Sequence, residues 1–315
     1  WKINMPKILI SDSLSDIAKE VFENNNIDVD VITDLKPDNL KGIIKYYDGL
    51  VVRSATNVSK EIIETADKLK IIGRAGAGID NIDVVTAKKK NIIVMNTPGG
   101  NTNATAEHTI SLILSLYRKI PETNDSTHKG LWEKKKYKGL ELRGKKIGLI
   151  GFGNVAQRVA EIVKGFDMEI SVFSESFESR KDNFSNIKSL PLDEILSFCD
   201  IISLHCNSQK NGNPIINLSE LKKMKKNAVI INTARGNLIN EVDLNTALKE
   251  SIIKGAALDV YSEEPAKNNI LFGANNLILT PHIAASTEDA QIIVAKQIAE
   301  QISEFFNTGK ITNSV

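Results

Sequence analysis

Residues 145–163 read KKIGLIGFGNVAQRVAEIV, and this stretch decides the fold class of the chain. Its apolar run KIGLI predicts a buried strand, and the GFGN that follows predicts a tight turn. The residues after the turn have the apolar spacing of a helix. Gly151 would permit the turn, Gly153 would let a pyrophosphate approach the backbone, and Ala156 would let the helix pack closely. A dinucleotide is therefore expected at this helix N-terminus, where backbone amides favour anions. The alternative is a tight turn without a ligand.

Short apolar runs alternate with helical patterns on both sides of this stretch. Before it come KILIS, DVDVI, GLVV and KIIGRAG, with helical patterns near residues 14–24, after Pro37 and near residues 59–66. After it come EISVF, DIISLH, AVIINT, AALDV and LILT. This alternation predicts an α/β protein with two doubly wound, Rossmann-like parallel sheets.

The two predicted sheets are joined by long helical patterns. One covers residues 102–119, is ended by Pro121 and is expected to bridge the sheets. Another covers residues 287–306 and would cross back, leaving the tail ITNSV beside the first sheet. We therefore expect a nucleotide domain (100–285) inserted into a discontinuous substrate domain (1–99 and 286–315). Ligands should bind in the cleft between them.

The composition indicates an ordinary globular protein. Its 315 residues include 40 basic and 39 acidic side chains, a formal charge of +1, which gives no reason to expect a nucleic-acid or membrane partner. Four scattered histidines predict no metal site, and Cys199 and Cys206 are expected to lie buried around a strand rather than in a disulfide. No apolar run approaches the roughly 20 residues of a membrane helix. Residues 1–6 lack the form of a signal peptide, so the cytoplasm is the expected compartment.

The strand EISVF should end in an acid that binds the adenosine ribose. The chain has Ser174 there, which can still hydrogen-bond a ribose hydroxyl, with Glu175 beside it as a second candidate. The nearest cations, Arg180 and Lys181, lie several residues further on, and Glu175 would repel a 2′-phosphate. NAD is therefore the expected cofactor, and Ser174 leaves NADP as the alternative.

Three further motifs place polar side chains at the ends of predicted strands. Arg235 follows AVIINT, Asp259 and Glu264 follow the start of AALDVYSEEP, and His282 follows LILT. Parallel strands share one carboxyl edge, so these side chains should meet near the dinucleotide loop. His282 suits proton transfer near neutral pH, Glu264 beside it would orient the imidazole, and Arg235 can hold a carboxylate by a two-pronged pair. Taken singly, each is more commonly a structural histidine or a surface ion pair.

Seven motifs, in order and spacing, resemble those of the D-isomer-specific 2-hydroxyacid dehydrogenases: VVRSAT, GRAGAGIDNID, NTPGGNTNATAEHT, GLIGFGNVA, NTARGN, ALDVYSEEP and TPHIAAS. The resemblance covers nearly the whole chain. It implies a catalytic set of Arg235, Glu264 and His282, in which His282 is the acid/base and Glu264 its partner. It also implies that Asp259 holds the nicotinamide amide. The cofactor contacts it implies are Gly151, Gly153, Asn154, Val155, Ser174, His205, Cys206, Thr233, Ala234, Asp259, His282 and Ala284.

Within that family, the motifs are most similar to those of the enzymes that interconvert 3-phospho-D-glycerate and 3-phosphohydroxypyruvate, the first step of phosphorylated serine biosynthesis. A phosphate would bind at the end of VVRSAT, and backbone amides of GRAGAG would grip the carboxylate, although a plain turn is an alternative there. In LWEKKKYKG, Lys134 would serve the neighbouring subunit's site, unless the basic triplet is simply a solvated face. The expected substrate contacts are Arg53, Ser54, Gly76, Ala77, Gly78, Asn101, Arg235 and Lys134.

The resemblance further implies a homodimer built on the helix over residues 102–119 and the arm after it. Three departures from the family pattern are Ser174 for the usual Asp, Ala156 for the third glycine, and HCNSQ where a Pro commonly follows. A reductase of hydroxypyruvate, glyoxylate or another D-2-hydroxy acid is the first alternative function. A non-catalytic dinucleotide sensor of the corepressor kind is the alternative from another class.

Overall fold

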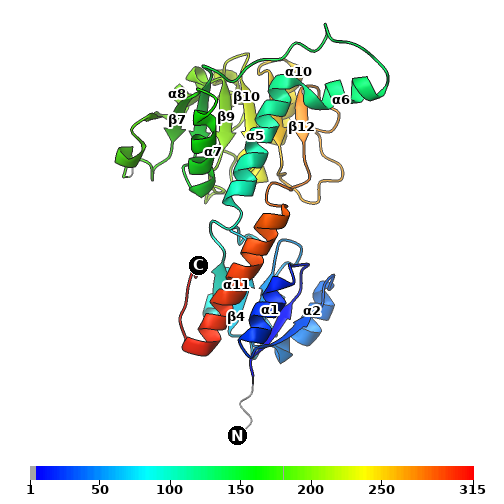
Figure 1. Ribbon diagram of the computed structural model, residues 1–315, viewed down its shortest axis with the longest axis vertical. Coiled ribbons are helices and arrows are strands. Elements are labelled where there is room, and N and C mark those ends of the chain that lie inside the picture. The colour runs from blue at the N-terminus through cyan, green and yellow to red at the C-terminus, as the bar shows by residue number, and fades with distance from the viewer. Residues whose placement is uncertain (1–4, 180) are drawn as a thin grey trace. The chain divides into compact units, whose positions relative to one another are not determined.

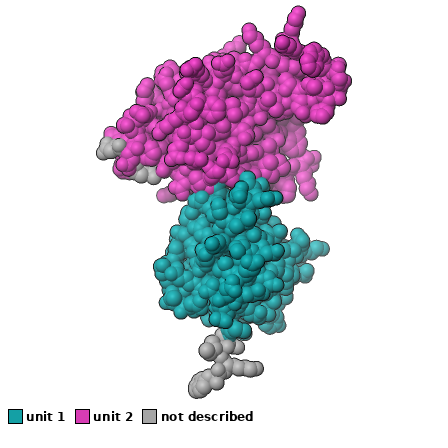
Figure 2. Space-filling view, viewed as in Figure 1, with its two compact units in different colours: residues 1–101, 286–315 teal, residues 102–285 magenta. Residues whose placement is uncertain are grey.

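The structure, a computed structural model, describes residues 5–179 and 181–315. The chain divides into two compact units, Trp1–Asn101 with Ser286–Val315 and Thr102–Ala285, coloured separately in Figure 2. Each unit has a parallel sheet with connecting helices, which confirms the predicted fold class. Arg180, one of the two cations considered near the ribose, and residues 1–4 lie outside the described residues.

The first unit is built on a sheet whose described strands run in the order β2-β1-β3-β4-β5. The strands are β1 (Lys7–Ile10), β2 (Asp28–Val31), β3 (Gly49–Val52), β4 (Ile71–Arg74) and β5 (Ile93–Asn96). The connecting helices are α1 (Ile17–Asn24), α2 (Pro37–Ile43) with the 3-10 helix η1 (Ile44–Tyr46), α3 (Lys60–Glu64) and α4 (Val84–Lys89). The edge strand β5 was not predicted from the sequence.

The C-terminal helix α11 (Glu288–Thr308) belongs to the first unit, where it packs along α1 (Figure 1). Its Ile298 and Ile302 lie so close to Gly73 of β4 that any side chain there would collide with them. The chain then turns back along β5. Backbone bonds run from the amide of Val315 to the carbonyl of Val94 (3.0 Å) and from Asn96 to Asn313 (3.2 Å). The tail therefore joins the first unit, as the sequence predicts.

The second unit has a sheet whose described strands run in the order β12-β11-β10-β9-β6-β7-β8. They are β6 (Lys146–Ile150), β7 (Glu169–Phe173), β8 (Ile187–Ser189), β9 (Ile201–Leu204), β10 (Val229–Asn232), β11 (Gly255–Leu258) and β12 (Leu277–Leu279). β8 is another edge strand that the sequence reading missed. Because the order reverses beside β6, the loops that follow β6 and β9 are neighbours at the carboxyl edge of the sheet, where α/β proteins bind ligands.

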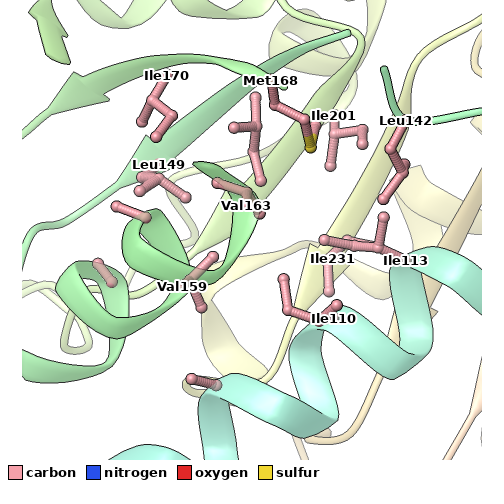
Figure 3. Packing of buried hydrophobic residues seen from close by; sticks show 14 of the residues in the cluster. Ile110, Ile113, Leu142, Leu149, Val159, Val163, Met168, Ile170, Ile201 and Ile231 are labelled. Atoms are coloured by element: carbon pink, nitrogen blue, oxygen red, sulfur yellow. The ribbon is translucent and has the colours of Figure 1, made fainter. Parts of the chain in front are cut away.

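Helices cover both faces of this second sheet. α5 (Thr102–Arg118) and α7 (Asn154–Lys164) lie side by side on one face (Figure 1). Figure 3 shows Ile110 and Ile113 of α5 and Val159 and Val163 of α7 packed with apolar side chains of the strands. Further helices of this unit are α8 (Leu192–Phe198), α9 (Leu218–Lys223), α10 (Glu241–Lys249) and the 3-10 helices η2 (Lys181–Phe184) and η3 (Gly236–Leu238).

The predicted helix over residues 102–119 is confirmed, but Pro121 is not the residue that ends it. α5 ends at Arg118, and Lys119 takes a left-handed conformation (φ 54°) that breaks the helix. A second helix, α6 (Ile120–His128), then begins with Pro121 in its first turn. Proline is tolerated in that turn because its missing N–H would have no intrahelical partner there.

Neither a membrane-spanning helix nor a cluster of metal ligands occurs among the described residues. None of the helices there combines the length and the apolar character needed to cross a membrane. Nowhere in residues 5–179 and 181–315 do three His, Cys, Asp or Glu side chains gather closely enough to hold a metal ion.

Candidate active site and dinucleotide-binding loop

The two glycines after β6 are required for different reasons. Gly151 has φ +91°, and a Cβ there would lie 2.7 Å from the carbonyl carbon of His205, so the fold itself excludes a side chain. Gly153, the N-cap of α7, has φ −77° and ψ −169°, which any residue adopts. A Cβ on it would meet no atom of the described residues within 4 Å. The space beside Gly153 leaves the first amides of α7 accessible, and these amides have no intrahelical acceptor and suit an anion such as a pyrophosphate.

An aromatic cluster holds the loop between β6 and α7 in place. Phe152 is buried between the two glycines, and its ring makes edge contacts with Phe177 and Phe184, each at a centroid distance of 4.9 Å. Both partners come from the segment after β7, where the ribose is expected to bind. The cluster therefore ties the loop after β6 to the segment after β7. Ala156, also buried, lies one helical turn into α7.

Ser174 lies at the end of β7, as predicted, with its Oγ 3.2 Å from the Oγ of Ser176. Glu175 beside it is exposed. Lys181 is paired with Glu178, with 3.0 Å between Nζ and Oε2. Of the two cations considered for a 2′-phosphate, the one that the structure describes already has a carboxylate partner.

His205 and Cys206 line the neighbouring loop after β9. The Nε2 of His205 is 2.9 Å from the Oγ of Ser203. Burial lowers the pKa of His205 from 6.5 to about 4, so this imidazole is neutral at physiological pH. Burial also raises the pKa of the Cys206 thiol, although this residue is only half-buried, whereas Cys199 is fully buried. The predicted burial of both cysteines is correct for Cys199 and only partly so for Cys206.

His282 and Glu264 form a close pair after β12 and β11. Nδ1 of His282 lies 2.6 Å from Oε2 of Glu264, whose Oε1 accepts the amide of Tyr261 at 3.0 Å. The hydrogen bond to Glu264 raises the pKa of His282. Burial alone would raise the pKa of Glu264, but the bonds from His282 and Tyr261 together hold that pKa below its ordinary value. Because Nδ1 faces the carboxylate, Nε2 remains to exchange a proton, and the side chain of His282 is 50% exposed.

Arg235 acts on His282 from the loop after β10, and the close packing of Gly236 fixes the position of this loop. The next residue, Gly236, packs so tightly on the backbone of Tyr261 and Ser262 that any Cβ would collide with it. Asn232 closes the Arg235 loop: its amide donates to the carbonyl of Arg235 at 2.8 Å. The half-buried guanidinium makes a small contribution that lowers the pKa of His282. The carboxyl edge of the sheet thus brings together a guanidinium, an imidazole and a carboxylate.

Asp259 takes a different position from Glu264. Its side chain is 0% exposed. Oδ1 accepts from the Thr280 hydroxyl (2.5 Å) and the Ile283 amide (2.9 Å), and Oδ2 accepts from the Ala284 amide (2.8 Å). Burial alone would raise the pKa of Asp259, but these bonds and the nearby His108 side chain together lower it. Asp259 and the Ala284 amide therefore shape the loop that carries His282, and their contact with a cofactor remains a proposal.

Sequence reasoning missed two side chains of α5 that reach this edge. Nε2 of His108 is 3.0 Å from the Oγ1 of Thr280, and Thr109 and Thr233 have their hydroxyl oxygens 2.8 Å apart. A signal for His108 exists in the sequence: it shares a helix face with Ala104 and Leu112, which are buried, so a polar side chain there needs a partner.

In the first unit, the loop after β3 that carries Arg53 is held from two sides. Asp12 accepts the amides of Arg53 (2.5 Å) and Thr56 (3.2 Å), while the Asn81 amide group donates to the carbonyls of the same two residues at 2.7 and 2.6 Å. One guanidinium nitrogen of Arg53 donates to the carbonyl of Ser13, and Ser54 is exposed. The loop is thus rigid before any anion arrives.

The glycine loop after β4 is equally constrained. Gly76 has φ +145°, and a Cβ on it would collide with the Arg74 guanidinium. The carbonyls of Gly76 and Ala77 accept from the Thr97 amide (3.0 Å) and the Asn96 side chain (2.6 Å). Both carbonyls are thus turned toward the protein. Of the other expected substrate contacts, Gly78 and Asn101 are half-buried, whereas Lys134 is exposed in the segment after α6.

Comparison with known proteins identifies relatives of the chain. Residues 110–284 match the NAD binding domain of the D-isomer specific 2-hydroxyacid dehydrogenases. The chain is 39% identical over 310 residues to the D-3-phosphoglycerate dehydrogenase of Archaeoglobus fulgidus. That alignment covers 98% of this chain but only 59% of the relative, so the chain spans well under two thirds of its length.

Two solved structures are similar over almost their whole length. The 3-phosphoglycerate dehydrogenase of Entamoeba histolytica, solved with NAD+ bound, is 30% identical with a TM-score of 0.84, and the match covers 99% of this chain and 98% of that one. An acyclic imino acid reductase solved with NADPH and D-arginine is 32% identical with a TM-score of 0.87, and the match covers 98% and 99%.

Proposed function

Because the chain belongs to the D-isomer specific 2-hydroxyacid dehydrogenases, we propose that it interconverts 3-phospho-D-glycerate and 3-phosphohydroxypyruvate with NAD, the reaction that begins phosphorylated serine biosynthesis. The observation that carries the chemistry is the 2.6 Å contact between His282 and Glu264, which leaves one imidazole nitrogen to exchange a proton. The choice of a phosphorylated acid is supported by the rigid loop of Arg53 and by the relatives named above.

In the oxidative direction, Nε2 of His282 takes the proton from the substrate hydroxyl oxygen as a hydride leaves the carbon that bears this hydroxyl. NAD supplies the hydride acceptor. Glu264 stabilises the imidazolium that forms, which is the state favoured by the raised pKa of His282. In the reductive direction the imidazolium returns the proton to the carbonyl oxygen.

Other side chains bind and orient the substrate in this proposal. Arg235 pairs with the carboxylate through its planar guanidinium and polarises the adjacent oxygen. The amides of residues 76–78 bind the same carboxylate, and Arg53 with Ser54 binds the phosphate. Asn101 and Lys134 are also proposed to contact the substrate, with Lys134 provided by a second copy of the chain.

The residues around the two glycines fit the cofactor. Gly153 and the first amides of α7, those of Asn154 and Val155, would hold the pyrophosphate. Ser174 would hydrogen-bond the ribose. Neutral His205, together with Cys206, Thr233 and Ala234, would form the wall of the pocket, and Asp259 is proposed to hold the nicotinamide amide.

A substrate panel tests this function. We expect NADH-dependent reduction to have its highest kcat/KM with 3-phosphohydroxypyruvate, compared with hydroxypyruvate, glyoxylate and pyruvate. A higher kcat/KM with an unphosphorylated acid would assign the chain to the reductases of the same family. Tight NADH binding without turnover of any acid would instead favour a dinucleotide sensor.

We also propose that two copies of the chain associate through α5 and the arm that follows it. Ile120, Leu131 and Trp132 of this arm are exposed apolar side chains, and Trp132 is 87% exposed. Adjacent exposed apolar side chains such as Leu131 and Trp132 are typical of a protein–protein interaction site. Light scattering should give a mass of twice the 34.7 kDa of the chain, and replacing Trp132 by Ser should shift it towards the single mass.

A further inference from the structure

Consecutive residues of α5 contact the carboxyl edge of the second sheet. Thr109 meets Thr233 after β10, and His108 meets Thr280 after β12. The His108 side chain is only 18% exposed, and its Nε2 lies 3.0 Å from Thr280 Oγ1 and 3.5 Å from Asp259 Oδ1. The reaction proposed above has no use for this histidine.

The donors and acceptors in this contact have a fixed direction. The carboxylate of Asp259 can only accept, so the single hydroxyl proton of Thr280 goes to its Oδ1, 2.5 Å away. The Thr280 oxygen must then accept from His108, which therefore carries a proton on Nε2. The result is a chain of hydrogen bonds from His108 through Thr280 to Asp259.

This chain ends on the loop that carries His282. The amide of His282 donates to the Thr280 carbonyl at 3.1 Å, and the Tyr261 hydroxyl donates to the same oxygen at 2.8 Å. The Asp259 carboxylate holds Ile283 and Ala284 on the other side. His282 itself has φ +54°, a left-handed conformation that a non-glycine residue keeps only where its surroundings enforce it.

We propose that His108 is a positioning residue for the dehydrogenase reaction: by donating to Thr280 it holds the 280–284 loop, so that the His282 imidazole stays aligned with Glu264. This proposal rests on the acid/base role proposed for His282. It predicts that loss of the His108 donor slows the chemical step without weakening the binding of the dinucleotide. A residue needed only for folding would lower the thermal midpoint instead.

The first experiment compares His108→Leu with His108→Gln in the full chain. Leu fills similar space without a donor, whereas the Gln amide can still donate to Thr280. With whichever D-2-hydroxy acid the parent turns over fastest, we expect His108→Leu to lower kcat about tenfold and to leave KM for NAD within about twofold. His108→Gln should recover most of that loss. Unchanged kcat in His108→Leu, or equal loss in both variants, would overturn the proposal.

Thr280→Val tests the link between the two ends of the chain. The substitution keeps the side-chain shape and removes the hydroxyl, so it should lower kcat as His108→Leu does, and the double variant should be no slower than either single variant. If the loss of kcat in the double variant equalled the product of the two single losses, His108 would act by a route that does not include Thr280. Thr246→Val is the matched control, because the Thr246 hydroxyl bonds only a carbonyl of its own helix α10 among the described residues.

A measurement without turnover separates this proposal from the proposed function. The chain has four histidines, so nitrogen NMR of labelled protein near neutral pH can report the tautomer of each. We expect His108 protonated on Nε2 and not on Nδ1, and His108→Leu should broaden or shift the signal of His282. A proton on Nδ1 of His108 would contradict the proposed direction of donation, even if the parent turned over no acid at all.

Discussion

The imidazole of His282 and the carboxylate of Glu264 meet at 2.6 Å, and the two ends of that carboxylate have different partners: Oε2 faces the imidazole and Oε1 is held by the amide of Tyr261. The carboxylate therefore cannot turn away from the imidazole without losing a backbone bond. This geometry makes the protonation of His282 depend on Glu264, and it sets the first prediction.

Glu264→Gln should shift the pH profile of reduction to lower pH. Reduction needs the imidazolium, so in the parent the rate falls as pH rises through the raised pKa of His282. Without the negative partner the imidazolium is less stable, so we expect the pKa of His282 to fall. The dependence of kcat/KM on pH measures the change. If the rate of reduction fell at the same pH in the variant as in the parent, another group would give the proton.

His282→Ala should reduce kcat far more than it changes KM for the hydroxy acid. In the proposed reaction the imidazole exchanges its proton in the transition state. Its loss therefore removes an interaction made mainly there, and we expect the rate to fall roughly 100-fold to 10,000-fold. NADH binding, followed by fluorescence, should be nearly unchanged. A variant that keeps most of the parent kcat would exclude His282 as the acid/base.

Substitution by alanine should lower stability at Gly151 and cofactor binding at Gly153. Gly151→Ala places a Cβ 2.7 Å from the His205 backbone at φ +91°, so we expect a loss of about 2–4 kcal/mol in the free energy of unfolding. Gly153→Ala meets open space, so stability should be unchanged, but NADH binding should weaken about tenfold or more because the Cβ occupies the place of the pyrophosphate. Denaturant unfolding and fluorescence titration measure these effects. Normal NADH affinity in Gly153→Ala would place the pyrophosphate elsewhere.

Arg53→Gln should affect phosphorylated substrates selectively. A charge-assisted bond to phosphate contributes about 2–3 kcal/mol, so kcat/KM for 3-phosphohydroxypyruvate should fall roughly 30-fold to 150-fold. The value for hydroxypyruvate should stay within about twofold of the parent. Arg143→Gln is the matched control, since Arg143 is an exposed arginine paired with Asp167. Equal losses for both substrates would show that Arg53 does not read the phosphate.

NADH should be preferred over NADPH. Glu175 at the end of β7 would repel a 2′-phosphate, and Lys181 is already paired with Glu178. The ratio of kcat/KM for the two cofactors measures the preference. A ratio that favours NADPH would show that Ser174, in place of the usual acid, is enough to admit the phosphate.

Much of the fold was predictable because it depends on local pattern. The apolar runs, the helical spacing and the glycines of GFGN predict parallel strands, crossover helices and the turn at Gly151 from their own residues. Strand length does not explain the errors, since β5 has four residues, as the predicted β1 does. The sequence predicted no strand at β5 or β8 and no helix after Pro121, whereas a left-handed Lys119 is followed by the second helix α6.

The sequence by itself determined which residues follow which strands, and hence that Arg235, Asp259, Glu264 and His282 belong to one edge of a parallel sheet. Only the tertiary structure decided which of these side chains contacts the imidazole of His282 and which is buried beneath its loop. Asp259 directly follows β11 and is buried under the loop after β12, whereas Glu264 lies beyond a turn that returns to the imidazole.

The same holds for the glycines and for His108. Spacing marks Gly151 and Gly153 as a loop, but only the packing around them shows that the fold requires the first and leaves open space beside the second. His108 is far from His282 in sequence, and a helix on one face of the sheet brings it to Thr280. Such contacts depend on how α5 packs across the strands, and no local pattern of residues contains that information.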